Sequence, residues 1–206
     1  MPFGYSWDFT LPVIKSPTPT LILILVCVVI AIVTRLGDNP EVTSELMIAS
    51  QSDYRFHDIM NGEVWRLFTP IFLHFSPMHL IFNMFWLYDL GGQIEQRIGY
   101  IRFIILVMML ALVSNITQYL LQNPSFGGMS GVVYGLFGYV FIRVRAEGSS
   151  AYFITHNNVI IMFGWFILCW TNVLGPVANW AHTGGLVLGL ALGAVGFGVQ
   201  RRRRLR

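Results

Sequence analysis

Six long stretches of apolar residues limit what this chain can fold into. They lie at residues 18–36, 77–96, 101–122, 129–144, 157–174 and 178–199. A helix that crosses the roughly 30 Å hydrocarbon core of a bilayer needs about 20 apolar residues. Backbone inside lipid must also satisfy its own hydrogen bonds, as a helix does. The sequence therefore predicts an all-α polytopic membrane protein with six transmembrane helices, of which the fourth, at 129–144, is short.

The composition agrees with a lipid bilayer as the surroundings of the chain. Of 206 residues, 55% are hydrophobic and 11% are charged, whereas a soluble domain carries about 25% charged residues. Little of the chain remains for a soluble domain, and we expect no nucleic-acid partner. Cys27 and Cys169 both lie in apolar stretches, which favours buried small side chains over a disulfide framework.

The remaining segments divide the chain around one membrane domain at 18–199. Residues 1–17 are expected to form a short cytoplasmic tail, and residues 200–206 a basic one. The connection at 37–76 is long and acidic, and its apolar residues near Trp65 recur every fourth position, at Val64, Phe68 and Phe72. That pattern is typical of a segment that lies in the headgroup region. Trp65 alone could be an ordinary aromatic anchor at the interface.

Arginines indicate the orientation. They occupy the connections after the second and fourth apolar stretches and follow the sixth: Arg97, Arg102, Arg143, Arg145, Arg201, Arg202, Arg203, Arg204 and Arg206. The connections at 122–128 and 172–179 carry no charge. Basic residues flank the cytoplasmic ends of transmembrane helices, so both termini are expected in the cytoplasm. The beginnings of the second, fourth and sixth helices then face the extracytoplasmic side.

A small-residue turn brings one serine to the start of the fourth stretch, in Gly127-Gly128-Met129-Ser130-Gly131. A serine hydroxyl becomes a useful nucleophile only when a base takes its proton, and His182 near the start of the sixth stretch could be that base. Gly-x-Ser-Gly alone more often marks helix packing. The two readings are compatible, because small residues let two helices approach closely, and such residues recur in both stretches: Gly131, Gly135, Gly185, Gly189 and Gly193.

The second stretch carries two polar side chains, His79 and Asn83, one helical turn apart. Each alone would be read as a buried polar residue with ordinary hydrogen bonds. A metal held by His74 and His79 lacks further ligands nearby, so we expect no metal and no cofactor. The sequence has no His-Glu-x-x-His, which excludes that class of zinc protease. Tyr88-Asp89 lacks the Gly-x-Gly-Asp partner of an aspartyl intramembrane protease.

Together, the segments around His79, Ser130 and His182 resemble the rhomboid family of intramembrane serine proteases, specifically its bacterial GlpG-type enzymes. The resemblance extends from about Val64 to Gly193. It includes Trp65-Arg66, which matches a loop half-sunk in the outer leaflet, and a Gly-Gly-x-x-Glu-x-Arg sequence at 91–97. Pro70 departs from it, because some relatives carry a histidine there. The resemblance implies a rhomboid-like bundle around a short fourth helix.

The resemblance also implies roles for the residues. Ser130 would attack the peptide bond with His182 as the base, and His79, Asn83 and the Ser130 N–H would hold the oxyanion. Tyr134 would stack on His182, and Gly128 and Gly131 would support the site. Substrates would be transmembrane proteins that enter from the lipid near the fifth helix. The expected location is the bacterial inner membrane, with the site open to the extracytoplasmic side.

One alternative is a catalytically silent rhomboid-like protein that binds or escorts membrane proteins. Such relatives have generally lost the serine or the histidine, and this chain keeps both. A transporter is disfavoured because the sequence shows no internal repeat. The stretches 129–144, 157–174 and 178–199 hold no Asp or Glu, so we expect a dyad without an acidic third member. The sequence does not name the substrate, its cleavage site, the oligomeric state, the regulation or the role of residues 1–17.

Overall fold

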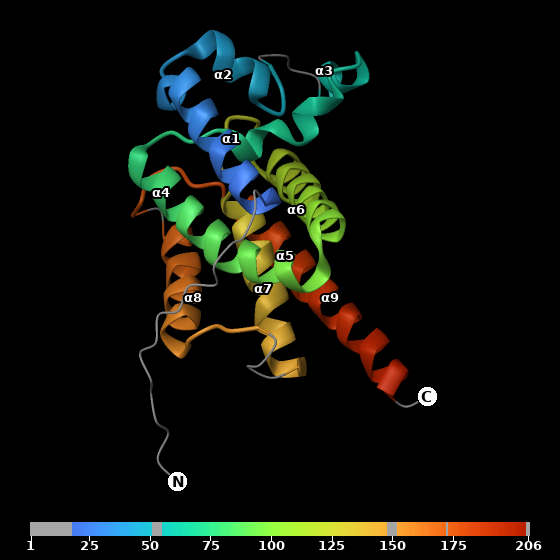
Figure 1. Cartoon of the computed structure of the whole chain (residues 1–206). Coiled ribbons are helices and arrows are strands. Elements are labelled where there is room, and N and C mark those ends of the chain that lie inside the picture. Colours follow the sequence, from blue (N-terminus) through green and yellow to red (C-terminus); the bar gives the residue numbers. More distant parts are fainter. Residues whose placement is uncertain (1–17, 51–54, 148–151, 172, 205–206) are drawn as a thin grey trace.

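The computed structural model describes residues 18–50, 55–147, 152–171 and 173–204 (Figure 1). Its regular elements in these ranges are all helical, so the all-α prediction is confirmed for this part of the chain. The α-helices are α1 (Pro19–Val33), α2 (Pro40–Leu46), α3 (His57–Met60), α4 (Pro77–Trp86), α5 (Gly92–Ile98), α6 (Tyr100–Leu121), α7 (Ser130–Glu147), α8 (His156–Trp170) and α9 (Asn179–Arg204). The predicted tail at 1–17 lies outside the described residues.

Several helix bounds differ from those expected. The second apolar stretch is divided into α4, a π-helical turn at Leu87–Gly91, and α5. α7 continues three residues past 144 to Glu147, and α9 continues past 199 to Arg204. Neither extension contains a proline, and arginine, glutamine and alanine favour helix, so nothing in the sequence stops the helix where the apolar residues end.

The start of α4 agrees with its sequence signals. Ser76 caps the helix by accepting a 3.2 Å hydrogen bond from the His79 N–H, and Pro77 occupies the first helical position. A proline there loses no intrahelical hydrogen bond. The cap therefore fixes the first turn of α4, which carries His79, and Asn83 follows one turn later.

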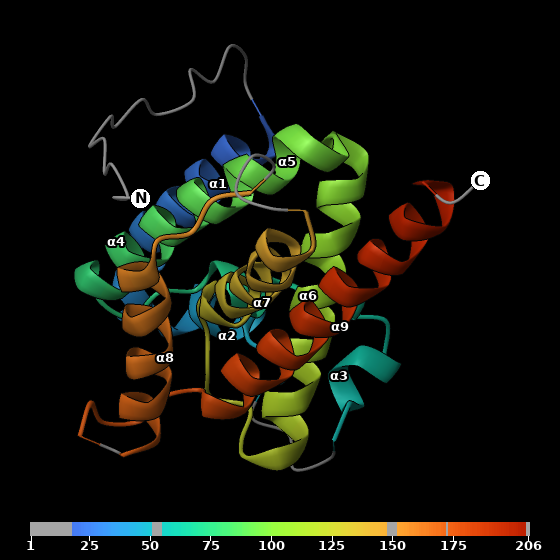
Figure 2. The same cartoon turned by 90° about the horizontal axis from the view of Figure 1, so that it is seen from below.

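The helix α7 lies among α4, α6, α8 and α9, as the view along the bundle shows (Figure 2). Every residue from Gly131 to Val140 is buried. A helix that is apolar all round is expected in such a buried position. The serine at its first position is thereby held by the most enclosed helix of the fold.

Glycines allow α7 and α9 to touch backbone to backbone. A Cβ atom on Gly185 would lie 1.9 Å from the Gly131 carbonyl oxygen, and one on Gly189 would lie 1.9 Å from that of Gly135. These separations leave no room for any side chain. The glycine spacing in the sequence is thus matched by a helix contact that only glycine permits.

Large apolar side chains point outward from several helices. Leu25 and Ile32 on α1, Ile101 on α6 and Ile167 on α8 are 62%, 70%, 76% and 64% exposed. Within the described ranges, α6 is the one helix long and apolar enough by length and composition to cross a membrane, and α1 and α8 are shorter apolar helices. An apolar outer surface of this kind is suited to lipid contact.

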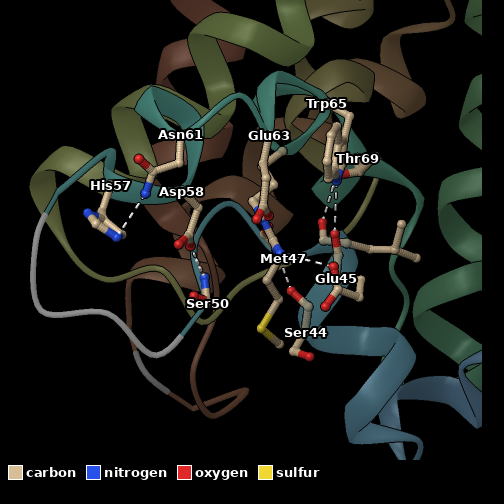
Figure 3. A network of polar contacts seen from close by, with 12 residues as sticks. Ser44, Glu45, Met47, Ser50, His57, Asp58, Asn61, Glu63, Trp65 and Thr69 are labelled. Atoms are coloured by element: carbon tan, nitrogen blue, oxygen red, sulfur yellow. Dashed lines mark hydrogen bonds and ion pairs between the residues drawn. The ribbon is translucent and has the colours of Figure 1, made fainter.

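The connection between α1 and α4 forms a compact polar unit at one end of the helices (Figure 1). Its buried Arg66 guanidinium donates to the Glu63 and Glu45 carboxylates and to the carbonyls of Ser44 and Met47. Figure 3 shows how the segment from Ser44 to Ser50 lies beside the segment from His57 to Thr69, with hydrogen bonds between the two. The Asn115 amide of α6 also donates to the Leu67 carbonyl at 2.9 Å, so the unit is anchored on the helices.

Asp58 joins the two segments of this unit. Its carboxylate accepts a 2.6 Å hydrogen bond from the Ser50 N–H (Figure 3). Burial alone would raise the pKa of Asp58, but the hydrogen bonds from Ser50 and the positive charges of Arg66 and His57 lower it. The ionised carboxylate is therefore the form that the folded loop favours.

Candidate active site

The structure brings Ser130 and His182 together. Ser130 is the first residue of α7, His182 lies in the first turn of α9, and Ser130 Oγ is 2.8 Å from His182 Nε2. The His182 side chain is 5% exposed. A hydroxyl within hydrogen-bond reach of an imidazole nitrogen is the geometry that a nucleophile and its base require.

The loop before Ser130 depends on two glycines. Gly128 has a φ of +127°, a conformation that residues with a side chain rarely adopt. A Cβ there would lie 2.6 Å from the His79 ring, and one on Gly127 would lie 2.5 Å from the Leu73 side chain. The Gly128 N–H donates to the Pro70 carbonyl at 2.9 Å. The serine loop is therefore fitted closely against both α4 and the connection between α1 and α4.

The start of α9 is held by polar side chains of its neighbours. Gln118 of α6 accepts hydrogen bonds from the Trp180 and Ala181 N–H groups at 3.1 and 3.2 Å. These are two of the N–H groups that a helix leaves without intrahelical partners. Gln118 thus links α6 to α9 by hydrogen bonds. His182, which follows directly, is thereby fixed in position.

Tyr134 packs beside His182, and Gly131 lies where α7 meets α9. The Tyr134 ring lies 4.8 Å from the His182 ring between centroids, at 40°, and its hydroxyl donates to the Met162 carbonyl of α8 at 3.3 Å. A Cβ on Gly131 would lie 2.7 Å from Ser114 and 3.1 Å from the Ala181 carbonyl. Tyr134 therefore limits the tilt of the imidazole, and Gly131 allows the two helices to meet.

A cavity of about 820 Å³ connects the pair to the two polar residues of α4. Ser130, His182, His79 and Asn83 all line it. Asn83 uses one amide hydrogen on the His79 carbonyl at 2.9 Å, which leaves its other amide hydrogen for a ligand. Apolar residues of α4 and α8 form much of the wall, including Phe82 and Trp165, whose rings stack at 5.9 Å. A chain segment with apolar side chains would fit such a cavity.

Asp89 and His74 do not line this cavity. Asp89 lies in the π-helical turn and accepts a hydrogen bond from Gln93 at 3.2 Å. His74 is fully buried, and its ring packs 5.0 Å from that of His79. Across the described residues no group of three His, Cys, Asp or Glu side chains could hold a metal. The expectation that the protein works without metal or cofactor stays a prediction.

Sequence reasoning did not single out Asn179. Its side-chain amide donates to the Cys169 carbonyl at 3.1 Å and so links the end of α8 to the start of α9. The only feature of the sequence that could have pointed to Asn179 is that it is a polar residue three positions before His182. Pro70 was noted only as a departure, and the structure uses its carbonyl, which any residue supplies.

Comparison with known proteins completes this picture. Residues 61–199 match the family described as the rhomboid domain. The chain is 39% identical over 178 residues to the rhomboid protease GlpG of Salmonella paratyphi A and to that of Salmonella typhi, and 38% identical to that of Salmonella newport. The match covers 85% of this chain and 62% of each relative, so the chain spans less than two thirds of their length. With its serine and histidine in contact and this match over most of its length, the chain belongs to the rhomboid family, in its bacterial GlpG-type branch.

Proposed function

We propose that this protein is an intramembrane serine endopeptidase that cleaves peptide bonds in or near transmembrane segments of other membrane proteins. The observation that carries the proposal is the 2.8 Å contact between Ser130 Oγ and His182 Nε2 inside a cavity lined mostly by apolar side chains. Its relatives bear the name rhomboid protease. Rhomboid-family membership makes the chain an integral membrane protein.

The residues suggest a two-step hydrolysis. Ser130 Oγ attacks the carbonyl carbon of the scissile bond while His182 Nε2 takes the hydroxyl proton. The Ser130 N–H, His79 and Asn83 donate hydrogen bonds to the oxyanion. His182 then gives the proton to the leaving amine, and an acyl ester remains on Ser130. A water molecule, deprotonated by His182, hydrolyses this ester and restores the serine.

We infer that the catalytic pair works without a carboxylate. Within the described part of the chain, His182 Nδ1 is buried and has no hydrogen-bond partner, whereas the third member of a triad would bond there. Asp89 is engaged by Gln93. A dyad of this kind depends on packing, by Tyr134 and the α7–α9 glycines, to orient the imidazole.

We further propose a topology of six membrane-spanning units: α1, α4 with α5, α6, α7, α8 and α9. Both termini would lie in the cytoplasm, by the arginine distribution, and the site would open to the extracytoplasmic side of a bacterial inner membrane. From Ser130 to Arg143 is roughly 20 Å of helix, against a hydrocarbon core of about 30 Å. Ser130 would therefore lie about 10 Å below the outer boundary by the same two lengths.

A fluorophosphonate probe tests the proposal. The purified protein in detergent is incubated with the probe, and the labelled residue is identified by mass spectrometry. We expect labelling at Ser130, none in Ser130→Ala, and weak labelling in His182→Ala. Ser125→Ala is a matched control, because Ser125 lines the same cavity but makes no hydrogen bond to a histidine among the described residues, and it should label normally. Folded protein that resists the probe would instead favour a silent binding protein.

A further inference from the structure

Two polar atoms near the start of α9 are buried and without a hydrogen-bond partner among the described residues. They are the side-chain oxygen Oδ1 of Asn179 and the ring nitrogen Nδ1 of His182. Asn179 and His182 are 7% and 5% exposed. Because they are three residues apart on one helix, their side chains lie on neighbouring positions of the same face. Two unsatisfied polar atoms this close on one helix call for a common explanation.

The orientation of the Asn179 amide is fixed by its other contact. The Asn179 side chain lies 3.1 Å from the Cys169 carbonyl oxygen. Only the NH₂ group can donate to a carbonyl, so the NH₂ faces Cys169, and Oδ1 is the atom left over. Asn179 therefore has an acceptor, and not a donor, as the atom of its amide that is left without a partner.

The orientation of the His182 proton follows from the proposed reaction. A neutral imidazole carries one proton, and Nε2 can receive the Ser130 proton only if the ring proton is on Nδ1. Nδ1–H is then a buried donor, and a buried donor without an acceptor is unfavourable. The tautomer that the reaction needs is thus the one that requires an acceptor near Nδ1.

We propose that Asn179 is the positioning residue for His182, with its Oδ1 accepting from Nδ1–H through one bridging water molecule. The active-site cavity is lined by His182, by Ala178, which precedes Asn179, and by Cys169, whose carbonyl Asn179 contacts. A single water with two or more polar partners is a common way to satisfy buried groups. This inference rests on the proposed function, because it concerns the base of that reaction.

Among the described groups around His182, Asn179 is the one left to accept a hydrogen bond from Nδ1–H. Ser130 and Tyr134 reach the ring from α7, and the hydroxyl of Tyr134 is directed to Met162. His79 approaches from α4 and Cys169 lines the cavity from α8. Neither is an anion at neutral pH. Asn179 would take the place that a carboxylate occupies in a triad, with a neutral oxygen.

The test compares two replacements that both remove the donor to Cys169. Asn179→Asp keeps an acceptor oxygen, and Asn179→Leu keeps the approximate size without one. We expect Asn179→Leu to lower kcat about 10- to 100-fold with KM nearly unchanged, the loss expected when a buried donor is left without an acceptor. Asn179→Asp should be at least tenfold more active than Asn179→Leu. Its activity should also decline at a higher pH on the acid side than wild type, because a nearby carboxylate favours the protonated imidazole.

Controls separate this role from a structural one and from the proposed function. Trp170→Ala weakens the same α8–α9 contact, where Trp170 packs at 5.2 Å on Trp180, and it should leave the pH profile of kcat unchanged. Equal losses in Asn179→Asp and Asn179→Leu, with no shift of the pH profile, would show that Asn179 only joins the helices and would overturn the inference. If wild type does not cleave, or cleaves as well after Ser130→Ala, it is the proposed function that fails.

Discussion

Replacing Gly185 with alanine should separate α7 from α9 at the active site. The new Cβ would lie 1.9 Å from the Gly131 carbonyl oxygen, and real Cβ contacts essentially never fall below 3.0 Å. The obstacle is backbone on both sides, since Gly185 lies in α9 and Gly131 in α7. The two helices must therefore move apart by about 1 Å or more, the difference between these two separations.

This displacement acts directly on the Ser130 and His182 pair. Gly131 follows Ser130, and Gly185 lies one turn after His182, so an added 1 Å would bring the 2.8 Å contact beyond hydrogen-bond range. A misplacement of about 1 Å can cost about 100-fold in rate. Overpacking should also lower the free energy of unfolding by about 1–3 kcal/mol. We expect kcat of Gly185→Ala to fall about 100-fold, with a lower thermal unfolding temperature.

Two glycine variants serve as controls in the same assays, cleavage of a transmembrane substrate and thermal unfolding in detergent. Gly189→Ala meets the Gly135 carbonyl at the same 1.9 Å but one turn farther from His182, so it should destabilise to a similar extent and lose less activity. Gly164→Ala on α8 meets no atom within 4 Å and should be neutral or slightly stabilising. A Gly185→Ala protein with wild-type kcat would refute the reasoning.

Three further predictions concern other parts of the fold. Thr20→Val should lower the free energy of unfolding by about 1.5–3 kcal/mol, because the Thr20 hydroxyl donates to the buried Glu95 carboxylate at 2.6 Å; thermal unfolding measures it, and an unchanged midpoint would contradict it. Asp58→Asn should be less stable than wild type above pH 3.8, the ordinary pKa of an aspartate, and this gap should close below it. The pKa of Asp58 is lowered in the folded state, so its stabilisation is lost as the pH falls through the folded-state pKa; a gap constant with pH would be evidence against this. Asp89→Asn should keep substantial turnover. A loss of activity as large as that of His182→Ala, in folded protein, would contradict the proposed dyad.

The main catalytic candidates could be predicted because their signals are local. Ser76 and Pro77 mark the start of α4 by chemistry that neighbours in sequence supply, and the glycines around Ser130 mark a turn and a close helix contact. The spacing of His79 and Asn83 follows from helical periodicity alone. These residues required no knowledge of what lies across the bundle.

Other features depend on contacts between distant segments. The sequence placed Glu45 and Glu63 in an acidic loop, but their pairing with the buried Arg66 guanidinium is set by how that loop folds back on itself. The π-helical turn at Leu87–Gly91 has no periodic pattern that would have indicated it. Asn179 was indistinguishable from an ordinary polar residue at a helix start until its amide was seen against Cys169.

The division of the active site between α7 and α9 has a consequence for biosynthesis. The ribosome makes the connection between α1 and α4 before the Ser130 loop that packs against Pro70 and Leu73, and it makes His182 only with the last described helix. Until α9 has packed its glycines on α7, Ser130 lacks the histidine that the proposed reaction uses as its base. Under the proposed function, a nascent chain would therefore be unable to cleave other membrane proteins until its last described helix has packed.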